Sequence, residues 1–512
     1  MNRILSLLAA SLSTVSLQAL EFEFNNNLGS VSSSDVWLMW QQSPSGSNTT
    51  NTFTVSYKDY SDNTHSITLD SFPSTGTYAG LNQLSTPLQL SSIKSMTLTS
   101  VNSGVLYFGL DETGSGNPFS SSAAPSPQAD TYAFETVEIT SRGQQGDQGD
   151  LTAINYYSFP LNVQTYGTKS GVPNTLFQTS GFGANTRQST YTALQNTFVS
   201  PTPSGYNPVI TNGSNTVRIL GPAGYYFQNG STTKFTTGPY HTFQGYLAQV
   251  YADQQASENP TTTKLSYGGN GGYTADLTVT QHGEPGSETY GIKIDNVVSN
   301  TNTTPTPVSG SIVVDPDDDD NTPTSTLLYT GTWNDNMGTV DQTITDSGLL
   351  ATLVASASAS FITGAVNSDT AFPGSSATPP ENEFRFQESD DWFTQNPGNA
   401  ATDPGLYFDE LQPTPDELTE AYYDPFLSVI TDLADYSIYG SPYADRYGEW
   451  GVDLNATVYG LDLDPVDKWV ITLGAVPEPS HYTMMAGIAV LIGVVWLRRL
   501  DNSSSPRRNA QN

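Results

Sequence analysis

The first 160 residues alternate between short apolar segments and breaks that contain Gly, Ser or Asn. The segments read DVWLMW, TFTVSYKDY, HSITLDSF, SMTLTSV and GVLYFGL. Short segments that alternate or run apolar are typical of β-strands, in which successive side chains point to opposite faces. We therefore expect an antiparallel β lobe from Glu21 to about Pro160, without long helices.

Helical signals appear later in the chain. Phe243, Leu247, Val250 and Tyr251 recur near helical spacing. The run that opens with Thr414-Pro415-Asp416-Glu417 resembles a capped, amphipathic helix. These patterns predict helices mainly within 185–255 and 414–437.

The last segment before residue 475 is strand-like again, which predicts a fold that closes on itself. We expect a mainly β protein with a mixed α/β lobe. The β lobe would span about 20–185 plus terminal strands in 450–475 that include Trp469, and the mixed lobe about 186–449.

Charge and rare residues exclude several function classes. The formal net charge is −33, which would repel nucleic acid. With no Cys and only four His, none of them paired at metal-site spacing, we expect neither a metal nor a cofactor. The acidic run Asp315–Asp320 fits a solvated loop best, although a calcium site stays open as an alternative.

Both ends of the chain have the character of export signals. Residues 1–19 combine Arg3, an apolar stretch and a small residue at Ala19, as in a signal peptide. Near the other end, 16 residues from Tyr482 to Leu497 carry no charge and precede Arg498 and Arg499. This length is marginal for a membrane helix, and basic residues after it favour an inner-membrane anchor with a cytoplasmic tail.

One predicted hairpin carries candidate catalytic residues. In FETVEIT, Val137 and Ile139 face one side of the strand and Glu138 the other. The following segment, DLTAINYYSFPL, carries Asp150, Asn155, Tyr156 and Tyr157. Two carboxylates lined by aromatic rings suit sugar hydrolysis, in which one acid protonates the leaving oxygen and another activates water.

The C-terminal segment, residues 476–512, resembles the PEP-CTERM sorting signal of Gram-negative bacteria. The resemblance rests on Pro477-Glu478-Pro479, the short apolar span and Arg498-Arg499. It implies that an exosortase cuts near the triplet after a transient stay in the inner membrane. The protein would then reach the cell envelope surface or the extracellular matrix.

Residues 20–475 resemble glycoside hydrolase family 64, the thaumatin-like β-1,3-glucanases. Five segments in order carry this resemblance: SGVLYFGL, FETVEIT, DLTAINYYSFPL, FQGYLAQVYADQ and YSIYGSPYADRYGEW. The resemblance implies a two-lobed β-barrel or sandwich with a wide groove between the lobes. It also implies inverting hydrolysis of β-1,3-glucan.

The same resemblance implies roles for individual residues. Glu138 would be the general acid, while Asn155 stands where the family has an Asp, so that Asp150 would have to serve as base or the site is weakened. The implied substrate-binding residues are Tyr107, Tyr156, Tyr157 and Asp445. Asp445 fits equally well as a turn residue that pairs with Arg446.

Three functions remain open at this point. The first is an exported β-1,3-glucan hydrolase. The second is a non-catalytic glucan-binding protein on the same scaffold, which Asn155 would favour. The third is a structural protein of the envelope or the polysaccharide matrix.

Overall fold

The structure, a computed structural model, describes most of the chain between residues 19 and 476. The described residues are 19–42, 53–69, 83–119, 123–141, 148–198, 207–229, 239–240, 242–256, 263–267, 273–299, 306–314, 324–330, 340–342, 344, 347–362, 383–386, 424–434, 437–438, 440 and 466–476.

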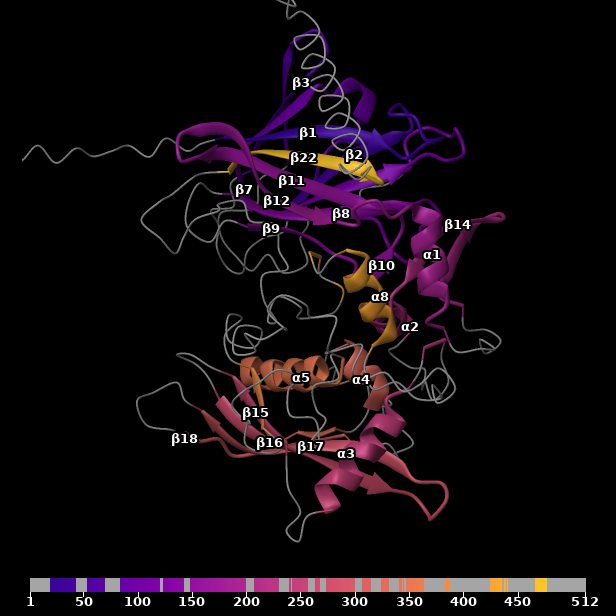
Figure 1. Cartoon of the computed structure of the whole chain (residues 1–512), viewed down its shortest axis with the longest axis vertical. Coiled ribbons are helices and arrows are strands. Elements are labelled where there is room, and N and C mark those ends of the chain that lie inside the picture. Colours follow the sequence, from indigo (N-terminus) through magenta and orange to yellow (C-terminus); the bar gives the residue numbers. More distant parts are fainter. Residues whose placement is uncertain are drawn as a thin grey trace, which may run out of the picture.

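A 12-stranded sheet forms the first lobe, shown in indigo and purple with one yellow strand in Figure 1. Its strands are β1 (Leu20–Asn27), β2 (Val36–Gln42), β3 (Phe53–Lys58), β4 (Thr64–Ile67), β5 (Gln83–Leu84), β6 (Leu88–Gln89), β7 (Ser95–Leu110), β8 (Phe134–Ser141), β9 (Gln148–Leu151), β11 (Leu161–Lys169), β12 (Val172–Gly181) and β22 (Val466–Gly474).

Two smaller sheets follow. The first comprises β10 (Tyr156–Tyr157), β13 (Val209–Asn212) and β14 (Asn215–Leu220). The second comprises β15 (Thr263–Tyr267), β16 (Tyr273–His282), β17 (Thr289–Ser299), β18 (Thr306–Pro307), β19 (Ile312–Val314), β20 (Val340–Gln342) and β21 (Glu383–Phe386). The helices are α1 (Arg187–Gln195), α2 (Pro222–Asn229), α3 (Gln244–Ala256), α4 (Thr324–Thr330), α5 (Ser347–Ile362) and α8 (Pro425–Leu433), with a 3₁₀ turn, η1 (Leu90–Ser92).

The large sheet is mixed and open. Its main path runs β12-β11-β22-β1-β7-β2-β5, with β3, β4, β6, β8 and β9 attached beside it. Within the described strands this path has two free ends, β12 and β5, so the sheet does not close. The mainly β class is confirmed; of the expected β-barrel or sandwich, the barrel is corrected, because the described strands form an open sheet.

Strand β7 links two parts of this sheet. Its first half lies between β1 and β3, and its second half lies between β2 and β8. A register shift separates Val101 from Gly104, and Ser103 adopts a left-handed φ of 56° there. An irregularity of this kind bends and twists a strand, which lets one strand serve both parts.

The last described strand, β22, lies in the same large sheet as the first strand, β1. β22 pairs parallel with β1 and antiparallel with β11. Trp469 of β22 is fully buried and stacks on Phe22 of β1, with ring centroids 5.5 Å apart. The strand pairing agrees with the expectation that the segment around Trp469 returns to the first sheet.

The second lobe packs helices on a sheet. Gln244 and Gln254, at the two ends of α3, each donate to one backbone carbonyl and accept from one backbone N–H. Gln244 bonds Tyr290 of β17, at 3.1 and 2.8 Å. Gln254 bonds Leu277 and Val279 of β16, at 3.1 and 2.9 Å. The two glutamines therefore fix α3 across both strands.

Helices α2 and α8 lie between the two lobes in Figure 1. Buried aromatic residues join the helices here: the Tyr226 ring stacks on Tyr329 at 5.7 Å, and Tyr240 meets Phe426 edge-on at 6.2 Å. Asp424 caps α8 by accepting from the Phe426 N–H at 2.9 Å. One continuous core therefore runs from the first sheet into the second lobe.

The predicted helices are found in part. α1, α2 and α3 lie within or at the end of 185–255, and α8 lies within 414–437, although Thr414 is outside the described residues. α4 and α5 were not expected. The sequence of α5, SGLLATLVASASASFI, is rich in Ala and Ser and has no polar face with helical periodicity. The residue boundaries of the lobes stay a prediction.

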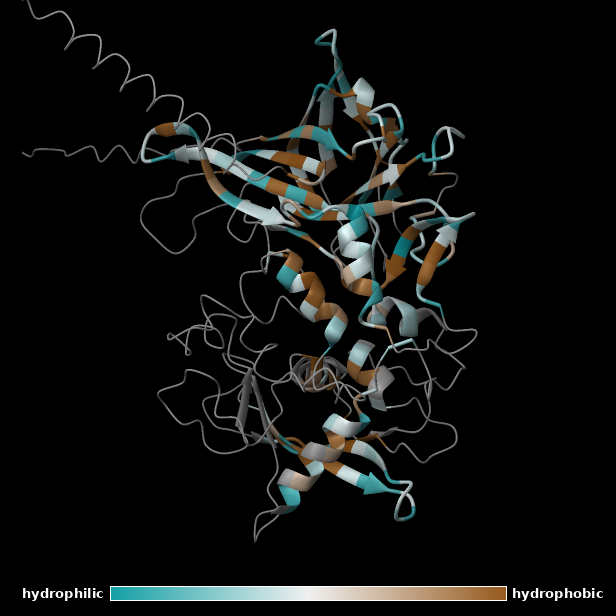
Figure 2. Ribbon diagram, turned by 45° about the vertical axis from the view of Figure 1, so that its right-hand side comes forward, coloured by the Kyte–Doolittle hydropathy of each residue, from teal (hydrophilic) through white to brown (hydrophobic). Residues whose placement is uncertain are grey.

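The alternation of apolar and polar residues along the strands explains which side chains are buried in the first lobe. Apolar (brown) and polar (teal) stretches alternate along its strands in Figure 2. In β8, Val137 and Ile139 are buried while Glu138 between them is exposed.

None of the described helices is long and apolar enough to cross a membrane. The expected span Tyr482–Leu497 lies outside the described residues.

The burial of Trp469 predicts a large effect on stability. Trp469→Ala should lower the free energy of unfolding by about 3–5 kcal/mol, because removal of a buried Trp leaves a cavity. Leu176→Ala on the edge strand β12 is the control, since Leu176 is 46% exposed and should change stability by less than about 0.5 kcal/mol. Urea unfolding of both variants measures the difference, and equal losses would contradict the role of β22.

Candidate active site

The two carboxylates of the predicted hairpin face each other across paired strands. Glu138 of β8 is the direct antiparallel partner of Asp150 of β9. Directly opposed side chains share one face of a sheet, and their Cβ atoms lie about 4.5–5.5 Å apart. The structure therefore brings together Glu138 and Asp150.

This pair continues as a row across the sheet. Glu138 pairs with Val105 of β7, and Val105 pairs with Gln41 of β2. The row thus reads Asp150, Glu138, Val105, Gln41 on one face. Residues of the opposite face, such as Val137, are buried in the core and hold the strands in place.

The environment of Glu138 favours its protonated form. Although its side chain reaches the surface, the packed neighbours displace water from its carboxyl group, and this desolvation raises the pKa of Glu138 above its usual range. An opposed carboxylate, Asp150, acts in the same direction because two like charges disfavour each other. Both effects disfavour ionisation of the two carboxyl groups at the same time.

Tyr107 lies in the next row, diagonal to Glu138. It is the partner of Thr136 on β8, two residues from Glu138, and it is half-buried. Its hydroxyl donates a hydrogen bond of 2.6 Å to Oε1 of Gln41. Burial, together with the charge of Glu138, raises the pKa of Tyr107 to about 12.

A buried aromatic layer supports this face. The Phe134 ring lies 4.9 Å from Tyr156 and 6.3 Å from Tyr107. The guanidinium of Arg218, which is fully buried, lies 4.1 Å from the Phe134 ring centroid and 5.4 Å from that of Tyr156. Arg218 also donates to the carbonyls of Pro127, Asp130 and Tyr132, so it fixes the chain that leads into β8.

A glycine lets β9 approach the sheet closely enough to place Asp150. A Cβ atom on Gly149 would lie 2.3 Å from the Trp469 ring and 2.9 Å from the Glu138 carbonyl oxygen. No larger residue fits there without displacing β9 or Trp469. The position of Asp150 therefore depends on the buried indole of the last strand.

Other predicted site residues lie elsewhere. Asn155 is exposed beyond the end of β9, and its carbonyl oxygen accepts from the Gly221 N–H at 2.9 Å. It does not oppose Glu138. Tyr157 has no exposed surface, and its ring packs on Phe182 at 4.8 Å. We therefore assign Tyr157 to the core rather than to a binding surface.

Tyr156 is only 8% exposed and packs on Phe134, whereas Tyr107 is half-buried. Asp445, the triplet Pro477-Glu478-Pro479 and Arg498-Arg499 lie outside the described residues, as does the acidic run 315–320. Within the part of the chain that the structure describes, no group of three or more His, Cys, Asp or Glu could hold a metal ion.

Sequence reasoning missed three residues near the site: Gln41, Arg218 and Glu135. The segment NTVRIL contains Arg218 within an apolar strand, and a charge in such a place indicates a buried partner. Gln41 lies on the same face of β2 as Met39. It was missed because the sequence does not reveal that β2 pairs with β7.

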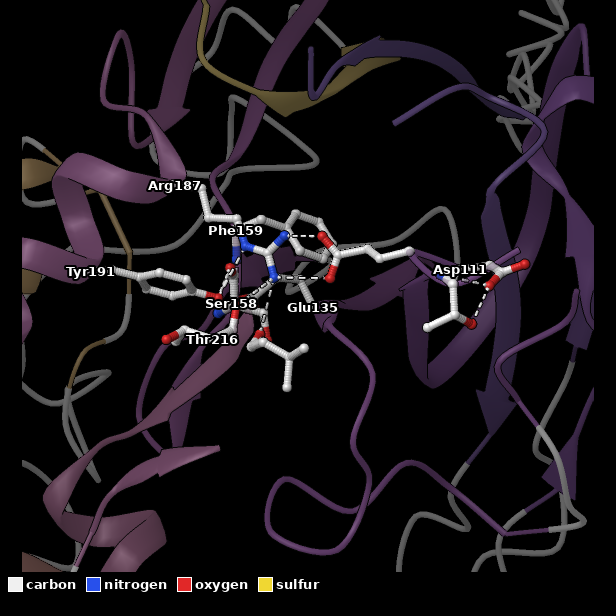
Figure 3. A network of polar contacts seen from close by, with 10 residues as sticks. Asp111, Glu135, Ser158, Phe159, Arg187, Tyr191 and Thr216 are labelled. Carbon is white, nitrogen blue, oxygen red and sulfur yellow. Dashed lines mark hydrogen bonds and ion pairs between the residues drawn. The ribbon is translucent and has the colours of Figure 1, made fainter. Parts of the chain in front are cut away.

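Glu135 belongs to a buried polar network (Figure 3). Its Oε1 accepts from the backbone N–H groups of Ser158 and Phe159, the second at 3.3 Å. Tyr191 donates to the Ser158 carbonyl oxygen at 2.6 Å. Desolvation raises the pKa of Glu135 to about 8, although both backbone bonds oppose the shift.

Arg187 of α1 completes this network. It pairs with Glu112, which follows β7, and donates to Tyr191 Oη at 3.0 Å and to the Thr216 carbonyl oxygen at 3.3 Å. These contacts tie α1 to the end of β7 and to β14. Glu135 faces the core and Glu138 faces solvent, so only Glu138 is placed to contact a ligand.

The comparisons with known proteins were made against families, curated proteins and solved structures. No protein-family model matches the chain, and no curated protein matches its sequence. Solved structures do resemble it. A β-1,3-glucanase domain of family 64 from Clostridium beijerinckii has 13% identity and a TM-score of 0.42, covering 89% of this chain and 98% of that one.

A second similar structure is the family 64 laminaripentaose-producing β-1,3-glucanase from Paenibacillus barengoltzii. Its identity is 14% and its TM-score 0.39, with 92% of this chain and 79% of that chain covered. The structure of this enzyme in complex with laminarihexaose matches over 48% of this chain and 57% of that chain, with 17% identity and a TM-score of 0.27. At these TM-scores the likeness does not assign a function.

The buried Glu135 predicts a stability that falls with pH. Its pKa in the folded state is about 8 against 4.5 for the free side chain, so the folded state binds the extra proton between these values. The free energy of unfolding should therefore decrease as pH rises from about 4.5 to 8, by an amount on the order of a few kcal/mol.

Glu135→Gln should remove most of this dependence, because the amide stays neutral. Asp424, whose pKa burial raises to about 7, contributes a slope of the same sign in both proteins, so the difference isolates Glu135. Glu284→Gln, in an exposed loop, is the matched control and should leave the slope unchanged. Urea unfolding at pH 5 and pH 8 measures it, and an unchanged slope in Glu135→Gln would disprove the assignment.

Proposed function

We propose that this protein hydrolyses β-1,3-glucan outside the cytoplasm, with Glu138 as general acid and Asp150 as general base. The observation that carries the proposal is the direct pairing of Glu138 with Asp150 on neighbouring strands. The pair lies beside Tyr107 on one face of the sheet, and desolvation raises the pKa of Glu138 above its usual range.

Each carboxyl has one task in this reaction. Glu138 gives its proton to the glycosidic oxygen as the bond from that oxygen to the anomeric carbon breaks. Asp150 takes a proton from a water molecule whose oxygen forms the new bond to the anomeric carbon. The products are two shorter saccharides, and one proton has moved from Glu138 to the leaving group.

The position of Asp150 supports a base other than Asn155. An amide does not accept a proton as a general base, and Asn155 lies apart from Glu138. Asp150 offers a carboxylate directly opposite. We therefore propose that Asp150 supplies the base, so that Asn155 does not weaken the site.

Inversion requires a water molecule between the sugar and the base. The carboxyl groups of inverting glycosidases lie about 6.5–9.5 Å apart, and those of retaining enzymes about 5–5.5 Å. Since the opposed Cβ atoms are about 4.5–5.5 Å apart, inversion needs the two side chains to diverge. The longer side chain of Glu138 allows such divergence.

The choice of β-1,3-glucan rests on the five ordered segments that resemble family 64. The half-buried aromatic ring of Tyr107 beside the carboxyl pair suits a sugar face. A wide groove between the lobes remains part of this proposal. The alternative is a protein that binds glucan without cleaving it, or one that is structural only.

The proposal predicts the effects of three substitutions on laminarin hydrolysis. Glu138→Gln should lower kcat by about 10²–10⁴, because the amide keeps the shape and has no proton to give. Asp150→Asn should have a similar effect, and Asn155→Asp should not raise the rate. Glu21→Gln, which alters an exposed Glu of the same sheet, is the control and should leave kcat unchanged.

Reducing-end release and glucan binding together separate the alternatives. Wild-type protein that binds laminarin without releasing reducing ends would leave a binding protein. Wild-type protein that does not bind would leave the structural role. A gain of activity in Asn155→Asp alone would show that position 155, not 150, is the site of the base.

We also propose that the C-terminal segment sorts the protein through a transient inner-membrane anchor and an exosortase. The motif Pro477-Glu478-Pro479 and the arginines Arg498 and Arg499 support this proposal. Processing would leave the mature protein at the envelope surface or in the extracellular matrix.

Replacement of Pro477 and Pro479 by Ala should leave full-length protein in the membrane fraction, because the processing enzyme no longer recognises the tail. Fractionation and mass spectrometry of the C-terminus in the native host measure this outcome. A mature wild-type protein that always retains residues 480–512 would show that the tail is not a processed signal.

A further inference from the structure

Tyr107 has two polar diagonal neighbours on its face of the sheet, Gln41 of β2 and Glu138 of β8. Gln41 and Glu138 flank Val105 in one row of the sheet, on either side of β7. Tyr107 stands in the adjacent row, from which a long side chain can reach both diagonal neighbours. Its hydrogen bond goes to Gln41, at 2.6 Å.

A phenol has one hydrogen to donate, so its direction matters. While Gln41 Oε1 accepts that hydrogen, Tyr107 cannot donate it to Glu138. The hydrogen also stays on Tyr107 at neutral pH, because burial and the charge of Glu138 raise the pKa of Tyr107 to about 12. A donor aimed at Glu138 would stabilise its carboxylate and oppose its protonation.

We propose that Gln41 is a positioning residue: by accepting the hydroxyl hydrogen of Tyr107, it keeps that hydrogen from bonding to the Glu138 carboxyl. Gln41 does this from a buried position, 6% exposed, on a central strand. The benefit to catalysis rests on the proposed role of Glu138 as general acid, whereas the effect on its protonation does not.

The other groups around Glu138 do not substitute for this effect. Among the described residues, the titratable groups that face it are Asp150 from β9 and Tyr107 from β7. Its neighbours on the same face of β8, Thr136 and Thr140, carry no charge. The charge of Asp150 is common to every variant below, so differences between variants report on Tyr107.

The test measures the pKa of Glu138 directly, by ¹³C NMR of the side-chain carboxyl in the full chain, with Glu138→Gln used to assign the signal. Gln41→Leu removes the acceptor and frees the Tyr107 hydroxyl to turn. The pKa of Glu138 should then fall by about one unit. The alkaline limb of the kcat/KM profile on laminarin should move to lower pH by the same amount.

The decisive variant is the double substitution Gln41→Leu with Tyr107→Phe. Without the hydroxyl there is nothing to turn, so the pKa of Glu138 in the double variant should equal that in Tyr107→Phe alone. A merely structural role of Gln41 would lower the pKa equally in both backgrounds. That result, or an unchanged pKa in Gln41→Leu, would overturn the proposal.

Gln41→Met carries the same expectation and keeps the length of the side chain, in case the shorter Leu does not fold. Thermal unfolding of each variant shows whether the fold is intact before titration. If the pKa responds as predicted while laminarin is not hydrolysed, the positioning role stands and the proposed function fails. If laminarin is hydrolysed but the pKa of Glu138 does not respond, the proposed function stands and the positioning role of Gln41 fails.

Discussion

The candidate site depends on the packing of one indole ring. Trp469, in the last described strand, stacks on Phe22 of the first strand and lies where any side chain on Gly149 would collide with it. The ring thereby sets how closely β9 approaches the sheet, and β9 carries Asp150. The return of β22 to the first sheet therefore also sets the geometry of the site. Residues more than 300 positions apart in the chain determine where one carboxylate lies.

The sheet then imposes proximity on groups that repel each other. Antiparallel pairing places Glu138 opposite Asp150 whatever their charges, because the apolar face beneath, with Val137 and Ile139, fixes the register. Desolvation raises the pKa of Glu138, and like charge also disfavours two ionised carboxyl groups side by side. Acid–base chemistry needs a difference in pKa between two neighbouring carboxyl groups.

Local patterns in the sequence predicted the parts of the fold that local physics controls. Alternation indicated that Glu138 faces away from Val137, because a strand has a period of two. Partners could not be predicted in this way. Which strand lies beside β7, and hence that Gln41 meets Tyr107, depends on pairings between distant segments. Tyr157 was misplaced for the same reason, since its burial comes from Phe182 and Tyr191 far along the chain.

The helix α5 escaped prediction because its sequence, rich in Ala and Ser, lacks the charged stripe that reveals a surface helix. The proposed mechanism requires that Glu138 and Asp150 act together on one glycosidic bond with a water molecule between them. The anomeric form of the first reducing ends released from laminarin, followed by ¹H NMR before mutarotation, distinguishes inversion from retention. We expect the α-anomer, the product of inversion; the β-anomer as first product would contradict the mechanism.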